Sequence, residues 1–166
     1  MKKFLFLIVL FSACAQKKEF YRWENLPVKI QIHNAGQKEV IDFYNGQFSS
    51  HIFEESDEEG TVNVFPDANT FDEHGWTGWT DKKYEKGFII WGEIGLMKAN
   101  GYDFFDSSIT SEGRIVFAHE LMHLLGYSWH DDDPESLMYK VVPEEELENL
   151  FQPHLKDWIK ETYNIE

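Results

Sequence analysis

The stretch His119-Glu120-Leu-Met-His123-Leu-Leu-Gly126-Tyr-Ser-Trp-His130 is the most informative part of this 166-residue chain. Because an α-helix repeats about every 3.6 residues, His119 and His123 would lie one turn apart on the same helix face. Two neutral imidazoles in that arrangement can bind one metal ion, and zinc commonly takes such nitrogen ligands. Glu120 points away from the axis of the two ligands, so it can act as a base on a water molecule at the metal.

The residues after this predicted helix supply a third candidate ligand. Gly126 tolerates the left-handed backbone conformation that ends many helices, so the chain can turn back at this point. His130 can then approach the metal from a different direction. Three protein ligands leave one position of a tetrahedral zinc ion open for water, which is typical of a catalytic site rather than a structural one.

This pattern resembles that of the metzincin metallopeptidases, His-Glu-x-x-His-x-x-Gly-x-x-His followed by a methionine turn. The stretch from His130 to Tyr139, with Leu-Met-Tyr at 137–139, is similar to the matrixin branch of that family. The specific match covers residues 115–139. The resemblance implies an α+β, zincin-like fold: a small twisted mixed sheet, an active-site helix, a methionine turn at Met138 and C-terminal helices.

The third ligand departs from the family pattern. The family has two residues between the glycine and the third histidine, whereas this chain has three, residues 127–129. Trp129 occupies the family's ligand position and cannot bind zinc. We expect His130 to replace it, because its separation from Met138 matches the family. A carboxylate from Glu144–Glu146 would be the third ligand in another zincin branch, but the Leu-Met-Tyr sequence argues against it.

Together these residues predict a zinc-dependent endopeptidase that hydrolyses peptide bonds with a metal-activated water and Glu120 as general base. The expected metal ligands are His119, His123 and His130, and the expected partner is a protein or peptide substrate. The alternative is a catalytically inactive zinc-containing binding lipoprotein of the cell envelope, which the shifted third ligand leaves open. Glu120 argues against this alternative, because a purely structural metal site does not need a base.

The first residues are typical of a bacterial secretion signal. Lys2 and Lys3 precede an apolar run, Phe4 to Phe11. This run is shorter than the about 20 apolar residues that a membrane-spanning helix needs. We therefore predict a signal peptide over residues 1–13.

Cys14 follows this apolar run in a sequence similar to a lipobox, where the cysteine becomes the lipid-modified first residue. The small residues around it also fit a cleavage that would release a soluble protein, and this alternative stays open. The favoured prediction is a lipidated Cys14, a tether over residues 14–25 and a catalytic domain over residues 26–166. The lipid would anchor the protein in the bacterial cell envelope, at the outer membrane.

Composition limits the partners further. The formal net charge of −15 argues against nucleic acid. Acidic stretches such as Glu54–Glu59 and Asp131–Asp133 are more typical of solvated surface, although carboxylate oxygens leave calcium open as a second metal. Cys14 is the only cysteine, so no internal disulfide can form, and we expect a monomer with a single domain.

The remaining hydrophobic pattern indicates strands and helices around the metal-binding stretch. The long segment at 67–86 is predicted to be a loop, in which Trp76 and Trp79 pack over the sheet or, less favoured, line a substrate groove. The predicted elements are strands at Val28–Ile32, Thr61–Phe65 and Phe88–Trp91, a helix at Lys38–Phe53, the metal-binding helix from Ser111, and C-terminal helices that begin at Pro143 and Pro153.

Overall fold

The computed structural model describes residues 21–56, 62–67, 77–99, 102–106, 111–141 and 145–166. The predicted signal peptide at 1–13 and Cys14 lie outside these ranges. Among the described residues, no helix has the length and the apolar character that crossing a membrane requires.

The described strands form one mixed sheet of seven strands. Five of them run parallel in the order β1-β6-β4-β2-β3, while β5 and β7 pair with β6 in antiparallel orientation. The strands are β1 (Arg22–Trp23), β2 (Val28–Ile30), β3 (Phe53–Glu55), β4 (Val62–Asp67), β5 (Gly78–Glu85), β6 (Phe88–Ala99) and β7 (Tyr102–Asp103).

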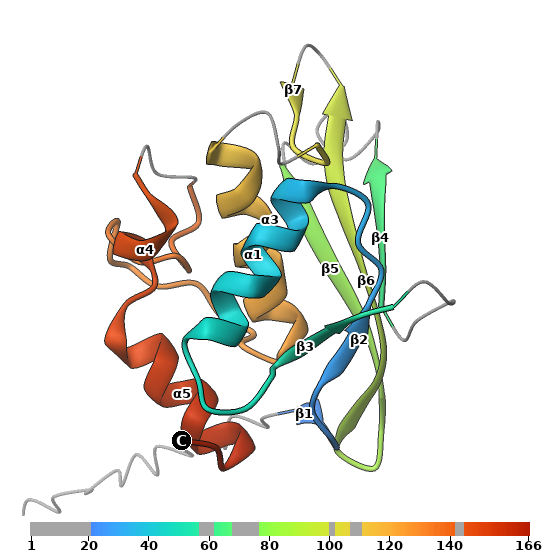
Figure 1. The fold of residues 1–166 in the computed structure, drawn as a ribbon, viewed down its shortest axis with the longest axis vertical. Helices are drawn as coiled ribbons and strands as arrows, with labels where there is room; N and C mark the ends of the chain where they lie inside the picture. The colour runs from blue at the N-terminus through green and yellow to red at the C-terminus, as the bar shows by residue number, and fades with distance from the viewer. Residues whose placement is uncertain (1–20, 57–61, 68–76, 100–101, 107–110, 142–144) are drawn as a thin grey trace, which may run out of the picture.

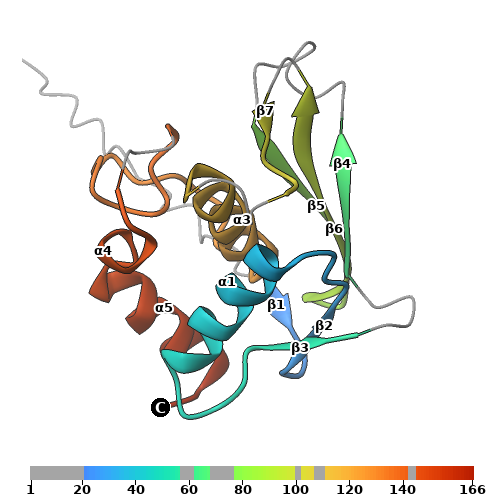
Figure 2. The same ribbon diagram turned by 45° about the horizontal axis from the view of Figure 1, so that its top comes forward.

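The described helices all lie on one side of this sheet (Figures 1 and 2). They are α1 (Ala35–Gly46), α3 (Ser111–Leu124), α4 (Leu147–Leu150) and α5 (Pro153–Tyr163). This mixed α/β architecture confirms the predicted mixed sheet and the presence of helices near the C-terminus, and it pairs β2 with β4 in parallel.

Helix α3 carries the stretch predicted to bind a metal and is buried on most of its surface. Phe117, Ala118 and Leu121 are fully inaccessible to solvent. α1 covers one side of the helix, where the Tyr44 hydroxyl donates a 2.7 Å hydrogen bond to the Ala118 carbonyl. A helix that is apolar on most of its faces is stable only inside a core, so the sheet, α1 and the C-terminal helices together fix the position of α3.

The predicted helix at 38–53 is wrong at both ends. The helix begins earlier because the Asn34 side chain caps it, accepting a 2.9 Å hydrogen bond from the Gln37 amide. The helix ends at Gly46. The side chain of the preceding residue, Asn45, accepts hydrogen bonds from the backbone amides of Ile52 and Phe53. These bonds turn the chain into β3, which pairs with β2.

The segment predicted as a loop at 67–86 contains strand β5, which pairs with β6 along its whole length. The Trp79 ring lies over Gly95, where an added Cβ would come within 2.4 Å of it. Its Nε1 donates a 2.8 Å hydrogen bond to the Asp67 carboxylate. Trp79 therefore packs against the sheet, as expected, but from a strand rather than a loop. Trp76 lies outside the described residues.

The other predicted strands and helices differ from the observed ones mainly in where they begin and end. β6 extends from Phe88 to Ala99 and is much longer than the predicted strand at 88–91. α3 and α5 begin at Ser111 and Pro153 as predicted. The helix expected from Pro143 begins instead at Leu147, and residues 142–144 are outside the described part of the chain. β1 lies within the stretch predicted as a tether.

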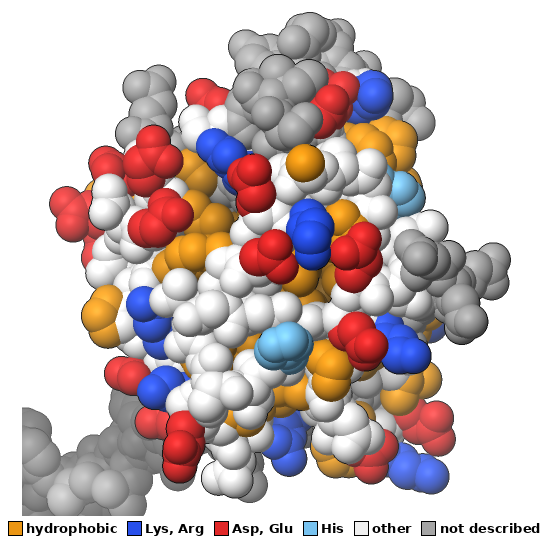
Figure 3. Space-filling view, viewed as in Figure 1, with side chains coloured by type: hydrophobic (Ala, Val, Ile, Leu, Met, Phe, Trp, Pro, Cys, Tyr) orange, Lys and Arg blue, Asp and Glu red, His pale blue; other side chains and the backbone are white. Residues whose placement is uncertain are grey.

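The surface seen in Figure 3 carries charges of both signs over α1, and acidic side chains gather over α4 and the chain beside it. On α1, Lys38 lies 3.6 Å from Asp42 and 3.5 Å from Glu55. Glu39 pairs with Arg114 of α3 at 2.8 Å. Exposed ion pairs of this kind stabilise a fold by at most about 1 kcal/mol each, so the buried core rather than these pairs holds α1 in place.

Candidate metal centre

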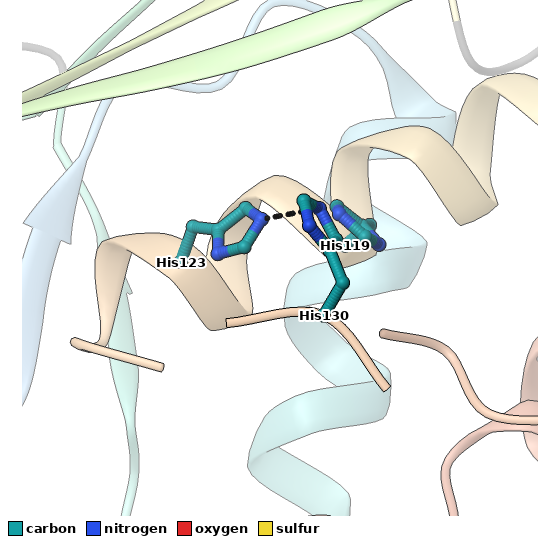
Figure 4. A group of neighbouring side chains, drawn as sticks. All are labelled: His119, His123 and His130. Atoms are coloured by element: carbon teal, nitrogen blue, oxygen red, sulfur yellow. Dashed lines mark hydrogen bonds between the residues drawn. The ribbon is translucent and has the colours of Figure 1, made fainter. Parts of the chain in front are cut away.

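Helix α3 and the loop after it bring three histidine rings together (Figure 4). His119 and His123 project from adjacent turns of α3, and their ring centroids are 4.7 Å apart. His130 approaches from the loop, and its Nε2 lies 3.3 Å from Nε2 of His123. One nitrogen from each ring lies within 4.8 Å of the other two. Two nitrogens on one tetrahedral zinc ion are about 3.3–3.4 Å apart, so the three histidines could hold a metal ion.

Backbone carbonyls orient the two helical histidines. Nδ1 of His119 donates a 2.7 Å hydrogen bond to the Leu137 carbonyl, and Nδ1 of His123 donates a 2.6 Å bond to the Tyr127 carbonyl. A carbonyl oxygen can only accept, so these bonds place the proton on Nδ1 and leave Nε2 with a free lone pair. Metal-binding histidines commonly have this outer support. The chemistry of the donor set therefore fits a zinc ion.

Burial keeps the same two rings neutral. It lowers the pKa of His119 to about 4, and together with the nearby His119 ring it lowers the pKa of His123 to about 3. A metal ion binds the neutral form of imidazole. Protons therefore do not compete with a metal for these two nitrogens near pH 7.

Gly126 redirects the chain as predicted. Its φ of 105° lies in the region that favours glycine, and a Cβ there would come within 2.0 Å of the Tyr21 carbonyl oxygen. Its amide donates a 2.9 Å hydrogen bond to the His123 carbonyl. Helix α3 ends just before this turn, so the residues after Gly126 can return His130 toward the helix.

Three side chains from separate elements cap the last carbonyls of this helical segment. The carbonyls of residues 123–125 accept hydrogen bonds from the Lys82 ammonium, from Trp23 Nε1 at 3.0 Å and from the Tyr163 hydroxyl at 2.8 Å, respectively. Carbonyls at a helix end have no partner within the helix. β5, β1 and α5 thus supply side-chain donors to the end of the helix that carries the candidate metal ligands.

The loop that carries the third histidine is fixed by Asp131. Its carboxylate accepts hydrogen bonds from the Tyr127 hydroxyl at 2.7 Å, from His154 Nε2 at 2.9 Å and from the Ser136 hydroxyl. Burial alone would raise the pKa of Asp131, but these three bonds lower it below its usual value. The Asp131 amide also donates a 2.9 Å hydrogen bond to the Met138 carbonyl. Through its side chain and its backbone amide, Asp131 therefore connects the loop, the Met138 segment and α5.

The additional residue before His130 packs away from the histidines. The Trp129 ring lies 4.1 Å from the Tyr127 ring and 6.2 Å from the Trp158 ring of α5, measured between centroids. The longer connection from Gly126 is therefore accommodated by an aromatic cluster. This packing leaves His130, and not Trp129, beside the two helical histidines.

Glu120 follows His119 in α3 and is only 5% exposed. Thr80 Oγ1 on β5 donates a 2.6 Å hydrogen bond to its Oε2. Burial raises the pKa of Glu120 to about 7, against the opposing effects of the Thr80 hydrogen bond and the nearby Lys82 charge. A carboxyl group whose pKa lies near neutrality can both accept and release a proton at physiological pH.

The Met138 segment is tied to His119 by a hydrogen bond. Met138 is completely buried, and the preceding carbonyl, that of Leu137, is the acceptor for His119. Within the described residues, the metal-binding group contains no carboxylate. Glu145 and Glu146 are exposed and do not belong to it, and Glu144 lies outside the described part of the chain.

Sequence analysis missed the residues that support the site from other elements. Thr80 and Lys82 lie on β5, which was predicted as a loop, and His154 lies on α5, far along the chain. The stretch Trp79–Lys83 has one apolar residue followed by four polar ones, so no alternation of apolar and polar residues indicated a strand there. Nothing in the sequence paired His154 with the loop.

No protein-family model matches the chain, and no curated protein matches it in sequence. What the structure defines is a mixed α/β protein in which His119, His123 and His130 could hold a metal ion. A more specific class of protein can be inferred only from the chemistry of these side chains.

Replacing Asp131 by Ala is expected to weaken zinc binding by about 10-fold to 100-fold, the usual effect of losing an outer partner of a metal site. The variant removes the acceptor shared by Tyr127, Ser136 and His154, so the loop that carries the third histidine should lose its fixed position. Competition with a chromogenic chelator measures the affinity. Asp132→Ala, at an exposed neighbouring position, is the control and should bind zinc like the wild type. Equal affinities of the two variants would contradict this role.

Proposed function

We propose that the protein is a zinc-dependent endopeptidase of the metzincin type, similar to the matrixin branch. The feature that carries this proposal is Glu120, a buried carboxyl residue that directly follows His119 in α3, the helix that carries two of the three histidines that could hold a metal ion. A structural metal site needs ligands alone. A hydrolytic site also needs a base, and Glu120 is the base that the chain offers here.

The proposed reaction divides the work between the metal and the protein. When bound by His119, His123 and His130, zinc would lower the pKa of water and polarise the carbonyl of the scissile peptide bond. Glu120 takes a proton from the attacking water and later donates it to the leaving amine nitrogen. Met138 supplies an apolar floor below the ligands, and the backbone carbonyls that bind both Nδ1 atoms keep the helical ligands in orientation.

The arrangement of the strands supports a zincin-like fold. Helix α1 connects β2 to β3, the parallel strand at the edge of the sheet. A single long antiparallel strand, β5, pairs with β6 and contacts α3, the helix that carries His119 and His123. The resemblance in the stretch at 115–139 implies such a mixed sheet with a helix that carries the ligands. The strand arrangement and the sequence motif therefore both favour a zincin-like protein, and the two are independent observations.

Zinc analysis combined with cleavage of a mixed peptide library tests the proposal. The described domain, without the first 20 residues, should contain about one zinc per chain, since the histidine cluster fits one ion. It should also cleave internal peptide bonds, with loss of activity when zinc is chelated and recovery when zinc is returned. A zinc-loaded protein that cleaves none of the peptides would favour the alternative, an inactive zinc-binding lipoprotein.

We also propose that the protein is held at the bacterial cell envelope by a lipid on Cys14. Mass spectrometry of the mature protein should find a diacylglyceryl group on an N-terminal Cys14, and Cys14→Ser should abolish its recovery with membranes. The reason is that the sequence around Cys14 follows a short apolar run, as in lipoprotein signals. A mature protein that begins at Gln16 or Lys17 and is free in the medium would contradict this.

A further inference from the structure

We infer that Thr80 is a positioning residue for Glu120: its hydroxyl holds one carboxylate oxygen of the base and leaves the other to accept the proton from water. This inference rests on the proposed function, because it assigns a role within the same reaction. It concerns β5, a strand that contributes nothing to the His-Glu-x-x-His pattern.

The contact is short and specific. Thr80 Oγ1 lies 2.6 Å from Glu120 Oε2 and 3.1 Å from the Glu120 backbone oxygen. A hydroxyl group has one proton, and the shorter distance together with the negative charge directs it to the carboxylate. Among the residues that the structure describes, the hydrogen bond found for the Glu120 carboxylate is the one from Thr80 to Oε2, and Oε1 lies beside Gly78. The two oxygens of Glu120 therefore differ: one is held by β5 and the other is available.

Gly78 makes room for this arrangement. A Cβ at Gly78 would come within 3.0 Å of Glu120 Oε1 and 2.8 Å of Val116 Cγ1 on the preceding turn of α3. Any larger residue would therefore press on the carboxylate. Gly78 and Thr80, two positions apart on β5, therefore complement the Glu120 side chain: Gly78 leaves space for the carboxylate, and Thr80 donates a hydrogen bond to it.

The sheet fixes the direction in which Thr80 points. Thr80 pairs with Ile94 of β6, and Gly78 pairs with Leu96. Ile94 and Leu96 are completely buried on the face that α3 covers. Paired residues in a sheet share a face, so Thr80 must face the metal-binding helix. A rigid strand orients a neighbouring group better than a loop does.

Lys82 strengthens the same contact between β5 and α3. It lies two residues beyond Thr80 on the same face, and its ammonium donates a hydrogen bond to the His123 carbonyl. The strand is therefore tied to α3 at two points, the general base and the carbonyl of the second histidine. This leaves little freedom for Thr80 to move relative to Glu120.

The test compares Thr80→Val, which keeps the shape and removes the hydroxyl, with Thr80→Ser, which keeps the hydroxyl. In zinc-loaded protein, Thr80→Val is expected to lower kcat by about 10-fold to 100-fold, the scale of misplacing a catalytic group. KM should stay within about twofold, because uniform binding of the substrate does not involve this hydroxyl. Thr80→Ser should retain most of the activity, and both variants should bind zinc like the wild type.

A binding experiment provides a second measurement that does not need turnover. Acetohydroxamate chelates zinc and offers a proton to a base held beside the metal. Calorimetry should find weaker binding to Thr80→Val than to the wild type, and no further loss when Thr80→Val is combined with Glu120→Gln. Such non-additivity is the sign that two residues act through each other.

The outcomes separate this inference from the proposed function. A wild type that cleaves no peptide overturns the peptidase proposal, while the acetohydroxamate cycle still measures the coupling of Thr80 to Glu120. Unchanged kcat and unchanged acetohydroxamate affinity in Thr80→Val would overturn the positioning role. Equal impairment of Thr80→Ser and Thr80→Val, or a shared loss of zinc or of thermal stability, would assign Thr80 to packing and overturn it as well.

Discussion

Replacing Glu120 by Gln is expected to lower kcat for peptide cleavage by at least about 100-fold, the scale of general-base catalysis. The amide has nearly the same shape as the carboxylate, and its oxygen can still accept the hydrogen bond from Thr80. It cannot take a proton from water at neutral pH. The variant should therefore keep its zinc and its melting temperature while losing turnover, which steady-state kinetics on a cleaved library peptide will measure.

Glu148→Gln is the matched control for this experiment. Glu148 is exposed on α4, away from the three histidines, so the same chemical change there should leave kcat unaltered. A Glu120→Gln variant that cleaves peptides as fast as the wild type would exclude Glu120 as the base.

Replacing His130 by Ala is expected to weaken zinc binding by at least about 100-fold, more than most changes in the outer partners of a metal site. Two nitrogens from one helix would then be the remaining protein ligands, whereas catalytic zinc sites normally use three. The 3.3 Å separation between Nε2 of His130 and Nε2 of His123 is the structural basis for this prediction. Competition with a chelator of known affinity gives the dissociation constant.

His51→Ala is the control, because His51 is exposed near the C-terminal end of α1 and takes no part in the histidine cluster. It should bind zinc like the wild type. An unchanged affinity of the His130→Ala variant would mean that another side chain completes the site. A crystal structure of that variant would then identify the replacement, with the acidic residues Asp131 and Asp132 as the first to examine.

The sequence predicted the parts of the site that depend on local spacing. His119, Glu120 and His123 are placed by one turn of one helix, and Gly126 ends that helix through a backbone conformation that glycine favours. His130 was predicted because its separation from Met138 matches the family pattern. The structure brings His119, His123 and His130 together. Local sequence patterns predicted these histidines and Glu120, but not the residues that support them from β5 and α5.

Contacts between distant elements could not be predicted in this way. Thr80 and Glu120 are 40 residues apart, and their hydrogen bond depends on the register of β5 with β6. The strand itself was missed because polar residues and glycines dominate the sequence before it, a composition typical of loops. Asn34 and Asn45 similarly shortened and shifted α1 through side-chain bonds to the backbone, which hydrophobic periodicity does not report.

The three donors at the end of α3 make the two ends of the domain part of the metal centre. Trp23 belongs to the first described strand and Tyr163 closes the last helix, yet both bind carbonyls immediately after the ligand-bearing turn. Local opening of either end would expose those carbonyls, so the ends should not fray independently of the centre. In hydrogen exchange, the amides of α3, β1 and α5 should then open together, as one cooperative unit, rather than as a stable core with loose ends.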